Sequence, residues 1–277
     1  MIKLFLSLLL IIYSTNSLSW NALGHRVIAQ IAYLNMTSQA RSIFDKYNSS
    51  MDKVYKPQSF IESSVWLDTL AYRGIKWYST MHYIDIPYSD DNSPLPIIQE
   101  INAIWAIKNS INIISNKYAS NFDKGIALRI ILHVVGDIHQ PLHTITKVSK
   151  KLPNGDRGGN LQLLKKNSIA KNLHAYWDRG GGLLKVINPT TLDMANEYLK
   201  LNPCNPNTIK VDLSAWANEA NDLAIKIAYK DLPKSKIISD KYQLKVKNLT
   251  KKQLAIAGCR IAAILNTAAS ISEITTR

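Results

Sequence analysis

Six histidines carry most of the chemical information in this sequence of 277 residues. They are His25, His82, His133, His139, His143 and His174. His133 and Asp137 stand at positions i and i+4, and so do His174 and Asp178. On a helix, each pair lies on one face, where imidazole and carboxylate can bind the same metal ion.

A single pair of this kind is common on helices without any metal, because residues at i and i+4 also pair for their own stability. Two pairs together with His143, which follows Asp137 after a Gln140-Pro141 turn, make coincidence a poor explanation. Imidazole and carboxylate ligands without thiolate suit zinc in an open, catalytic arrangement. The residues alone therefore predict a multinuclear zinc hydrolase.

The elements that must position these side chains are helical. Apolar residues recur at helical spacing in four long segments, which we expect to be helices: 101–114, 122–139, 211–229 and 249–270. The last one should be nearly all buried. Apart from a short piece near Gln162–Leu164, no segment has the alternation of a strand. With no internal repeat and no linker, the pattern predicts a mainly α, single compact helical domain.

The first 19 residues have the pattern of a secretory signal peptide. A positive start at Lys3 precedes an apolar run, and small residues follow at the two positions that a signal peptidase reads. The run is too short for a membrane span. We expect an exported protein, secreted or periplasmic, whose mature chain begins at Trp20, and no stable membrane association.

Charge and cysteine content narrow the class of protein. The chain has 34 Lys and Arg against 20 Asp and Glu, a net charge of +14 that suits a polyanionic partner such as nucleic acid or an anionic membrane. With a hydrophobic content of 46%, it is not a disordered chain. Its two cysteines, Cys204 and Cys259, exclude a disulfide scaffold, and in an oxidising compartment we expect them to pair.

The order of the motifs resembles that of the S1/P1 family of zinc-dependent nucleases, helical relatives of bacterial zinc phospholipase C. The matching motifs are Trp-x4-His at Trp20, Trp-x-Asp at Trp66, His-Tyr-x-Asp at His82, His-x3-Asp-x3-Pro-Leu-His at His133, Gly-Gly-Asn at Gly158 and His-x3-Asp at His174. The resemblance covers essentially the whole mature chain, residues 20–277. It implies a nuclease domain of the phospholipase C and nuclease P1 type.

Carried over residue by residue, the resemblance implies three zinc ions. The first would take Asp68, His82, His133 and Asp137, and the second would take His143, His174 and Asp178. The third would take Asp137, His25 and the α-amino nitrogen and carbonyl oxygen of Trp20. Asp137 would thus bridge two ions, and only cleavage after residue 19 would supply the free amine. His139 has no ligand role in this scheme, and we expect it to be structural or to support a ligand.

The family resemblance also implies the reaction. Clustered zinc activates water for in-line attack on phosphorus, so no side-chain nucleophile is needed. We take Asp68 and Asp137 as the catalytic carboxylates. The implied activity is endonucleolytic cleavage of single-stranded DNA and RNA to 5′-mononucleotides, often accompanied by 3′-nucleotidase activity, by a protein that we expect to be a monomer.

Four residues are candidate substrate contacts. In the family, the positions of Tyr83 and Asp85 stack on a base and hydrogen-bond to it, which would require an unpaired base. Asn160 would line the cleft. Some relatives carry Lys or Arg where this chain has Ala71, and Arg73 is the candidate substitute.

Two other hypotheses about the function remain open at this point. A zinc phospholipase C would use the same cluster on a lipid phosphodiester, although its last ligand is typically Glu rather than Asp178. The other hypothesis is a non-catalytic exported protein that binds zinc or nucleic acid. Against it, every metal-ligand position of the family is filled in this sequence, whereas an inactive protein would be expected to have lost at least one.

Overall fold

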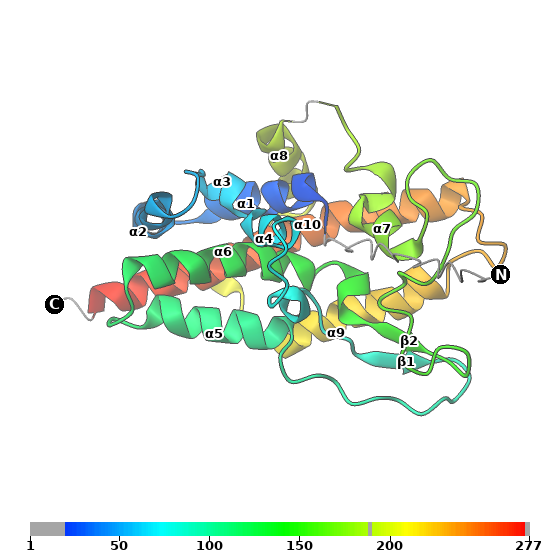
Figure 1. Ribbon diagram of the computed structural model, residues 1–277. Helices are drawn as coiled ribbons and strands as arrows, with labels where there is room; N and C mark the ends of the chain where they lie inside the picture. Colours follow the sequence, from blue (N-terminus) through cyan, green and yellow to red (C-terminus); the bar gives the residue numbers. More distant parts are fainter. Residues whose placement is uncertain (1–19, 188–189, 275–277) are drawn as a thin grey trace, which may run out of the picture.

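A computed structural model of the protein describes residues 20–187 and 190–274 (Figure 1). The expected signal peptide lies outside the described residues. Two strands and ten α-helices follow one another between short 3-10 turns and one π-helical turn. The helices are α1 Ala22–Asn35, α2 Ser38–Ser49, α3 Phe60–Ser63, α4 Trp66–Tyr72, α5 Ala103–Ser115, α6 Asn121–Asp137, α7 Leu173–Asp178, α8 Thr191–Leu201, α9 Leu213–Leu223 and α10 Asp240–Ile274.

The 3-10 turns include two that matter for the site, η2 Ser79–His82 and η3 Pro141–Thr144. The π-helical turn η6, Ala224–Tyr229, continues α9. Strands β1, Pro87–Ser89, and β2, Thr146–Val148, pair in parallel, with Pro87 opposite Thr146.

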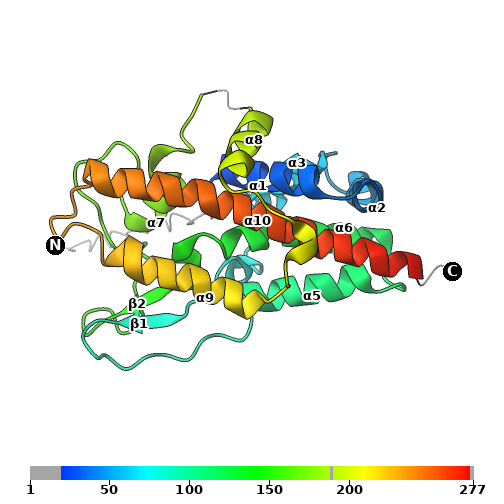
Figure 2. The same ribbon diagram turned by 180° about the vertical axis from the view of Figure 1, so that it is seen from behind.

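The main core lies where α10 crosses the molecule. In both views, α10 extends along nearly the full length of the molecule and lies beside α1 and α6 (Figures 1 and 2). Several of its apolar side chains, among them Leu254, Ile261 and Leu265, are fully buried. A Cβ added to Gly258 would lie 2.4 Å from a methyl carbon of Ile31, so glycine is what allows α10 to approach α1 so closely.

Side-chain caps fix where several helices begin. Asn21 accepts a hydrogen bond from Gly24 N–H at the start of α1, and Ser120 accepts one from Asp123 N–H at the start of α6. Asn172 does the same for Ala175 N–H in α7. These caps satisfy backbone donors that a helix leaves open at its first turn. They set the registers of the three helices that carry His25, His133 and His174.

The four expected helices are present, with small differences in their ends. The segment 122–139 ends as a helix at Asp137, and the segment 249–270 extends back to Asp240. The strand expectation was wrong: Gln162–Leu164 contributes only an isolated bridge between Leu163 and Asn172, whereas the strands are β1 and β2. Each has three residues, which is too short to show an alternating pattern in the sequence.

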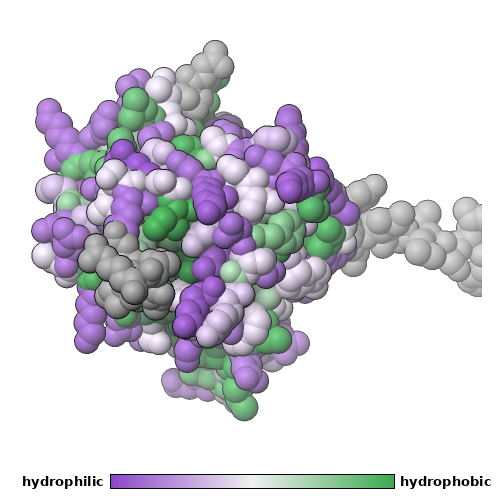
Figure 3. Space-filling model, turned by 90° about the vertical axis from the view of Figure 1, so that its left-hand side faces the viewer, coloured by the Kyte–Doolittle hydropathy of each residue, from purple (hydrophilic) through white to green (hydrophobic). Residues whose placement is uncertain are grey.

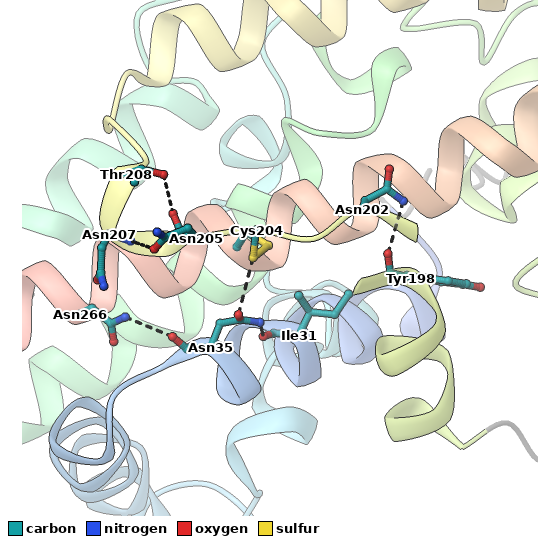
Figure 4. Close-up of a disulfide and its surroundings, with 10 residues drawn as sticks. Ile31, Asn35, Tyr198, Asn202, Cys204, Asn205, Asn207, Thr208 and Asn266 are labelled. Carbon is teal, nitrogen blue, oxygen red and sulfur yellow. Dashed lines mark hydrogen bonds between the residues drawn. A yellow bond between two sulfur atoms is a disulfide. The ribbon is translucent and has the colours of Figure 1, made fainter. Parts of the chain in front are cut away.

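The expected disulfide is present. Cys204, in the segment after α8, is bonded to Cys259 in α10, with 6.1 Å between the two Cα atoms. Asn35, at the end of α1, lies against this bridge (Figure 4). Its amide nitrogen donates to Ile31 O at 2.8 Å, and its backbone oxygen accepts from Asn266 Nδ2 at 3.2 Å. The bridge therefore joins the α8–α9 connection to the helical core.

Among the described helices, α10 alone is long and apolar enough to cross a membrane by length and composition, within Asp240–Ile271. Of its most apolar window, 67% is buried inside the protein, as expected of a core helix. The end of the molecule near the last turns of α10 mixes hydrophilic and hydrophobic residues over its surface (Figure 3).

Candidate metal centre

The imidazoles and carboxylates singled out in the sequence converge from six separate elements. Helix α6 supplies His133 and Asp137 from one face, and α7 supplies His174 and Asp178 in the same way. The remaining members come from α1, α4, η2 and η3: His25, Asp68, His82 and His143. They form three groups in which the candidate ligand atoms lie within 4.8 Å of one another.

The first group surrounds a point between α4, η2 and α6. His133 Nε2 lies 3.2 Å from His82 Nδ1, 3.4 Å from Asp68 Oδ1 and 3.5 Å from Asp137 Oδ2. His82 Nδ1 lies 3.1 Å from Asp137 Oδ2 and 4.0 Å from Asp68 Oδ1. A tetrahedral zinc ion with bonds of about 2.0–2.1 Å separates its ligands by about 3.3 Å. Four of the five separations lie close to this value, and the distance from His82 Nδ1 to Asp68 Oδ1 is longer.

Asp137 faces two groups at once. Its Oδ2 belongs to the first group, whereas its Oδ1 lies 3.4 Å from His25 Nε2. Both side chains are fully buried. Trp20 lies beside them, because its indole N–H donates to Gly136 O at 3.0 Å, and the next backbone N–H, that of Asn21, donates to Asp178 O at 3.0 Å. The backbone of Trp20 is thereby held between the ends of α6 and α7.

The second group, His143, His174 and Asp178, lies where η3 meets α7. His143 Nε2 and His174 Nε2 are 3.0 Å apart, and Asp178 Oδ1 lies 3.8 Å from the former and 3.6 Å from the latter. All three residues are buried. The i, i+4 spacing of His174 and Asp178 puts both on one face, as the sequence predicted.

The hydrogen bonds of the ring nitrogens show that this group fits a cation. His143 Nδ1 lies 2.8 Å from His82 O, and His174 Nδ1 lies 2.7 Å from Gly158 O. A carbonyl can only accept, so each Nδ1 carries a hydrogen and each neutral Nε2 holds a lone pair. Two lone pairs that face each other at 3.0 Å repel unless a cation lies between them. His133 follows the same rule, since its Nδ1 bonds Ser64 O at 2.7 Å.

Electrostatics at the first group also favour a cation. Although burial opposes it, the carboxylates of Asp137 and Asp68 raise the pKa of His133 to about 9. Burial lowers the pKa of His25 to about 3, with His133 acting in the same direction. Despite burial, the histidines lower the pKa of both Asp68 and Asp137, so both are carboxylates. A buried cluster with this negative charge needs a cation to balance it. Without metal, the protonated His133 ring supplies the positive charge.

Several supporting residues were not singled out in the sequence. Gln140 caps η3 by accepting from Leu142 N–H at 2.6 Å and donates to Asp178 Oδ1 at 2.7 Å. Its place inside the Asp-x-x-Gln-Pro-Leu-His run was the available signal. It orients the carboxylate of the second group, in the way that outer hydrogen-bond partners orient metal ligands.

The loop that holds His174 is organised by a fully buried carboxylate. Asp156 accepts hydrogen bonds from Tyr229 O–H at 2.9 Å, from Lys147 N–H at 2.9 Å and from Gly159 N–H at 3.1 Å. Two residues on, Gly158 presents its carbonyl to His174. No spacing rule links residue 156 to residue 229, so only the tertiary structure reveals this support.

The four candidate substrate contacts take different positions. Tyr83 and Asp85 follow His82 directly and are half-buried, and Asn160 is half-buried with its amide donating to Arg157 O at 2.8 Å. Burial raises the pKa of Asp85 to about 6. Arg73 is exposed at the end of α4.

His139 takes no part in the three groups. It is buried, its Nδ1 donates to Val135 O at 2.6 Å, and its Nε2 accepts from Arg260 Nη1 at 2.8 Å. Burial and the adjacent Arg260 guanidinium lower its pKa to about 3. It therefore connects the end of α6 to α10, in agreement with the expected structural or supporting role.

The model of the S1/P1 nuclease family matches residues 20–270. Endonuclease 1 of Arabidopsis thaliana is 28% identical over 93% of this chain and 90% of its own length. Nuclease S1 of Aspergillus oryzae is 26% identical over 91% of this chain and 92% of its own length. Nuclease P1 of Penicillium citrinum is 27% identical over 57% of each chain.

Proposed function

This chain belongs to the S1/P1 nuclease family, and from that premise we propose that it is an exported, zinc-dependent endonuclease of single-stranded DNA and RNA. The observation that carries the proposal is the set of three buried His and Asp groups, whose ligand separations and ring hydrogen bonds fit zinc. The comparison proteins named as nucleases extend over nearly the whole chain, which supports a hydrolase of phosphodiester bonds.

We assign the ligands of three zinc ions as the family pattern implies. The first ion would be held by Asp68, His82, His133 and Asp137, and the second by His143, His174 and Asp178. Support for the first assignment is the near-tetrahedral set of separations, and for the second the two facing Nε2 atoms.

The third zinc would be held by Asp137, His25 and the α-amino nitrogen and carbonyl oxygen of Trp20. Two observations support it: Asp137 turns one oxygen to each group, and hydrogen bonds fix Trp20 and Asn21 between α6 and α7. The family match begins at residue 20, which agrees with a mature chain and a nuclease domain that begin there.

When bound, zinc supplies Lewis-acid catalysis: it activates water as the nucleophile and stabilises charge on the phosphoryl and leaving oxygens. The residues of the chain supply the rest. Asp68 and Asp137 lower the charge of the centre, and burial excludes competing water. Gln140 holds Asp178 in position, and the carbonyls of Ser64, His82 and Gly158 hold the three imidazole rings in one tautomer.

Base recognition is assigned to the residues after His82. Tyr83 would stack on an unpaired base, and Asp85 would accept or donate a hydrogen bond at its edge. Asn160 and Arg73 would contact the substrate more weakly, because the Asn160 amide is already bonded within its loop and Arg73 lies at the exposed end of α4.

The test is hydrolysis of single-stranded RNA and DNA by the protein that begins at Trp20, with a chelated and a zinc-restored sample. Zinc-restorable release of 5′-mononucleotides is the expected result. A 3′-mononucleotide tests the accompanying phosphatase activity. If the folded, zinc-loaded protein releases no nucleotide but hydrolyses a phospholipid at its headgroup, the protein is a phospholipase C and the nuclease proposal is wrong.

The third zinc has a separate test. One extra residue before Trp20 leaves every side chain in place and removes the α-amine from its position. We expect a lower zinc content by atomic emission and loss of most of the activity. Full activity and full zinc content in the extended protein would refute the assignment of the amino terminus.

A further inference from the structure

The positive charge of this protein is concentrated in two segments. Residues 147–185 hold nine Lys and Arg against two Asp, and residues 226–247 hold seven Lys against two Asp. Together they account for most of the net charge of +14. One segment leads away from His143 toward His174, and the other joins α9 to α10.

The fold brings the two segments together at one end of the molecule. This end holds β1, β2, α7 and the first turns of α10, to the right in Figure 1 and to the left in Figure 2. Lys165 N–H donates to Lys236 O at 2.8 Å, and Lys236 Nζ donates to Gln162 Oε1 at 2.9 Å. Lysines that are far apart in sequence are therefore neighbours in space.

Aromatic rings lie between the ammonium groups. Lys147 Nζ lies 6.0 Å from the centre of the half-buried Tyr88 ring, and Lys230 Nζ lies 6.0 Å from the same ring. Lys147 Nζ is also 5.4 Å from the ring of Tyr229. Alternation of cations and aromatic rings is the usual surface of proteins that bind single-stranded nucleic acid without sequence preference.

Three acidic groups of this end are already engaged, whereas Asp240 is exposed. Asp90 pairs with Lys147, Asp231 pairs with Lys245, and Asp156 is buried in its loop. Within the part of the chain that the structure describes, Lys165 and Lys230 form no salt bridge, and both are exposed. The charge of these lysines is thus available to a partner.

This surface is continuous with the metal centre. Lys147 lies four residues after His143, and its N–H bonds Asp156, which organises the loop before His174. Arg157 is exposed in that loop and precedes Gly158, whose carbonyl orients His174.

We propose that Arg157, Lys147, Lys236, Lys165 and Lys230 form an exosite for the phosphate backbone of a long polynucleotide, outside the bond that is cleaved. The inference rests on the proposed nuclease function and adds a binding surface to it. The exosite retains a long strand near the metal centre, so that it contributes to binding of polymers and not to the chemical step.

The test compares a Lys165→Gln, Lys230→Gln double variant with a control that has the same loss of charge elsewhere. The control is Lys53→Gln with Lys56→Gln, two exposed lysines between α2 and α3, far along the sequence from both basic segments. Each protein is assayed on a long single-stranded DNA and on a dinucleoside monophosphate, over a range of salt concentrations.

For the exosite variant we expect KM on the long strand to rise several-fold with kcat unchanged. The slope of log kcat/KM against log salt should become shallower by about 1.4, since each phosphate contact of a single strand contributes about 0.7. The dinucleoside monophosphate should be cleaved as by the unmodified protein, and the control should behave as unmodified on both substrates.

Two results would overturn the exosite: an unchanged KM and salt slope on the long strand, or the same change in the control variant. Failure of the proposed function looks different, because the unmodified protein would then cleave neither substrate. A binding measurement in chelator, by fluorescence anisotropy of labelled single-stranded DNA, should show the same loss of affinity without any chemistry.

Discussion

Gly158 offers the sharpest test of how the second group of ligands is held. Its φ of +59° lies in the left-handed region, and a Cβ placed there would lie 2.2 Å from Leu142 O and 3.1 Å from His174 Nδ1. The first contact is with backbone and cannot be relieved by turning a side chain. A Gly158→Ala variant must therefore shift the loop whose carbonyl accepts the His174 hydrogen bond.

The expected effect has one part that acts without metal and one that acts only with it. Without metal, a left-handed φ destabilises alanine by about 1–2 kcal/mol, and the contact with Leu142 O adds to this loss. Disturbing an outer hydrogen bond of a metal-binding histidine weakens metal affinity by about 10–100-fold, which is about 1.4–2.7 kcal/mol. The two parts can be separated, because the first acts without metal and the second only with it.

Gly74 provides the matched control. Its φ is +81°, and a Cβ added there would meet nothing within 4 Å. Gly74→Ala should therefore show the backbone effect alone. We would measure the free energy of unfolding of both variants in chelator, and then zinc affinity by competition with a chromophoric chelator.

Weaker zinc affinity in Gly158→Ala, but not in Gly74→Ala, is the expected outcome. Equal zinc affinities in the two variants would refute the reasoning that the Gly158 carbonyl positions His174. Loss of stability in chelator alone, similar in both variants, would show only the backbone effect and would count against the positioning role.

Three further predictions concern other parts of the molecule. Asp137→Asn should reduce hydrolysis of single-stranded DNA by about 1,000-fold or more, since the effect of bound metal is worth several kcal/mol, and atomic emission should show reduced zinc content. Replacing Cys204 and Cys259 together by alanine should lower the free energy of unfolding by about 4 kcal/mol, because the bridge closes a loop with a sequence separation of 55; urea denaturation measures this, and a loss below about 1 kcal/mol would contradict it. Folding lowers the pKa of His139 from 6.5 to about 3. As the pH falls, the His139 ring is therefore protonated in the unfolded chain before it is protonated in the folded protein. The stability that the neutral ring contributes is complete above about pH 6.5 and is lost as the pH falls toward 3; His139→Gln should show a shallower decrease than the unmodified protein in urea denaturation across that range.

The kinds of ligand and their pairing could be predicted from the sequence alone. Ligand pairs at i and i+4, such as His133 with Asp137, share a helix face whatever the rest of the chain does, because the period of the helix is fixed. The helical class followed from the same periodicity, and the Cys204–Cys259 pair followed from there being two cysteines in a chain that we expect to be exported.

How the pairs combine depends on the packing of the whole chain. Asp68 and His82 reach the first group, and His25 reaches the other oxygen of Asp137, from three elements whose relative placement no local pattern encodes. The support of His174 through Asp156 and Tyr229, and the meeting of Lys147 with Lys230 around Tyr88, depend on contacts between residues more than fifty positions apart. Sequence periodicity reports the geometry within one element, whereas packing between elements sets which side chains share an ion or a substrate.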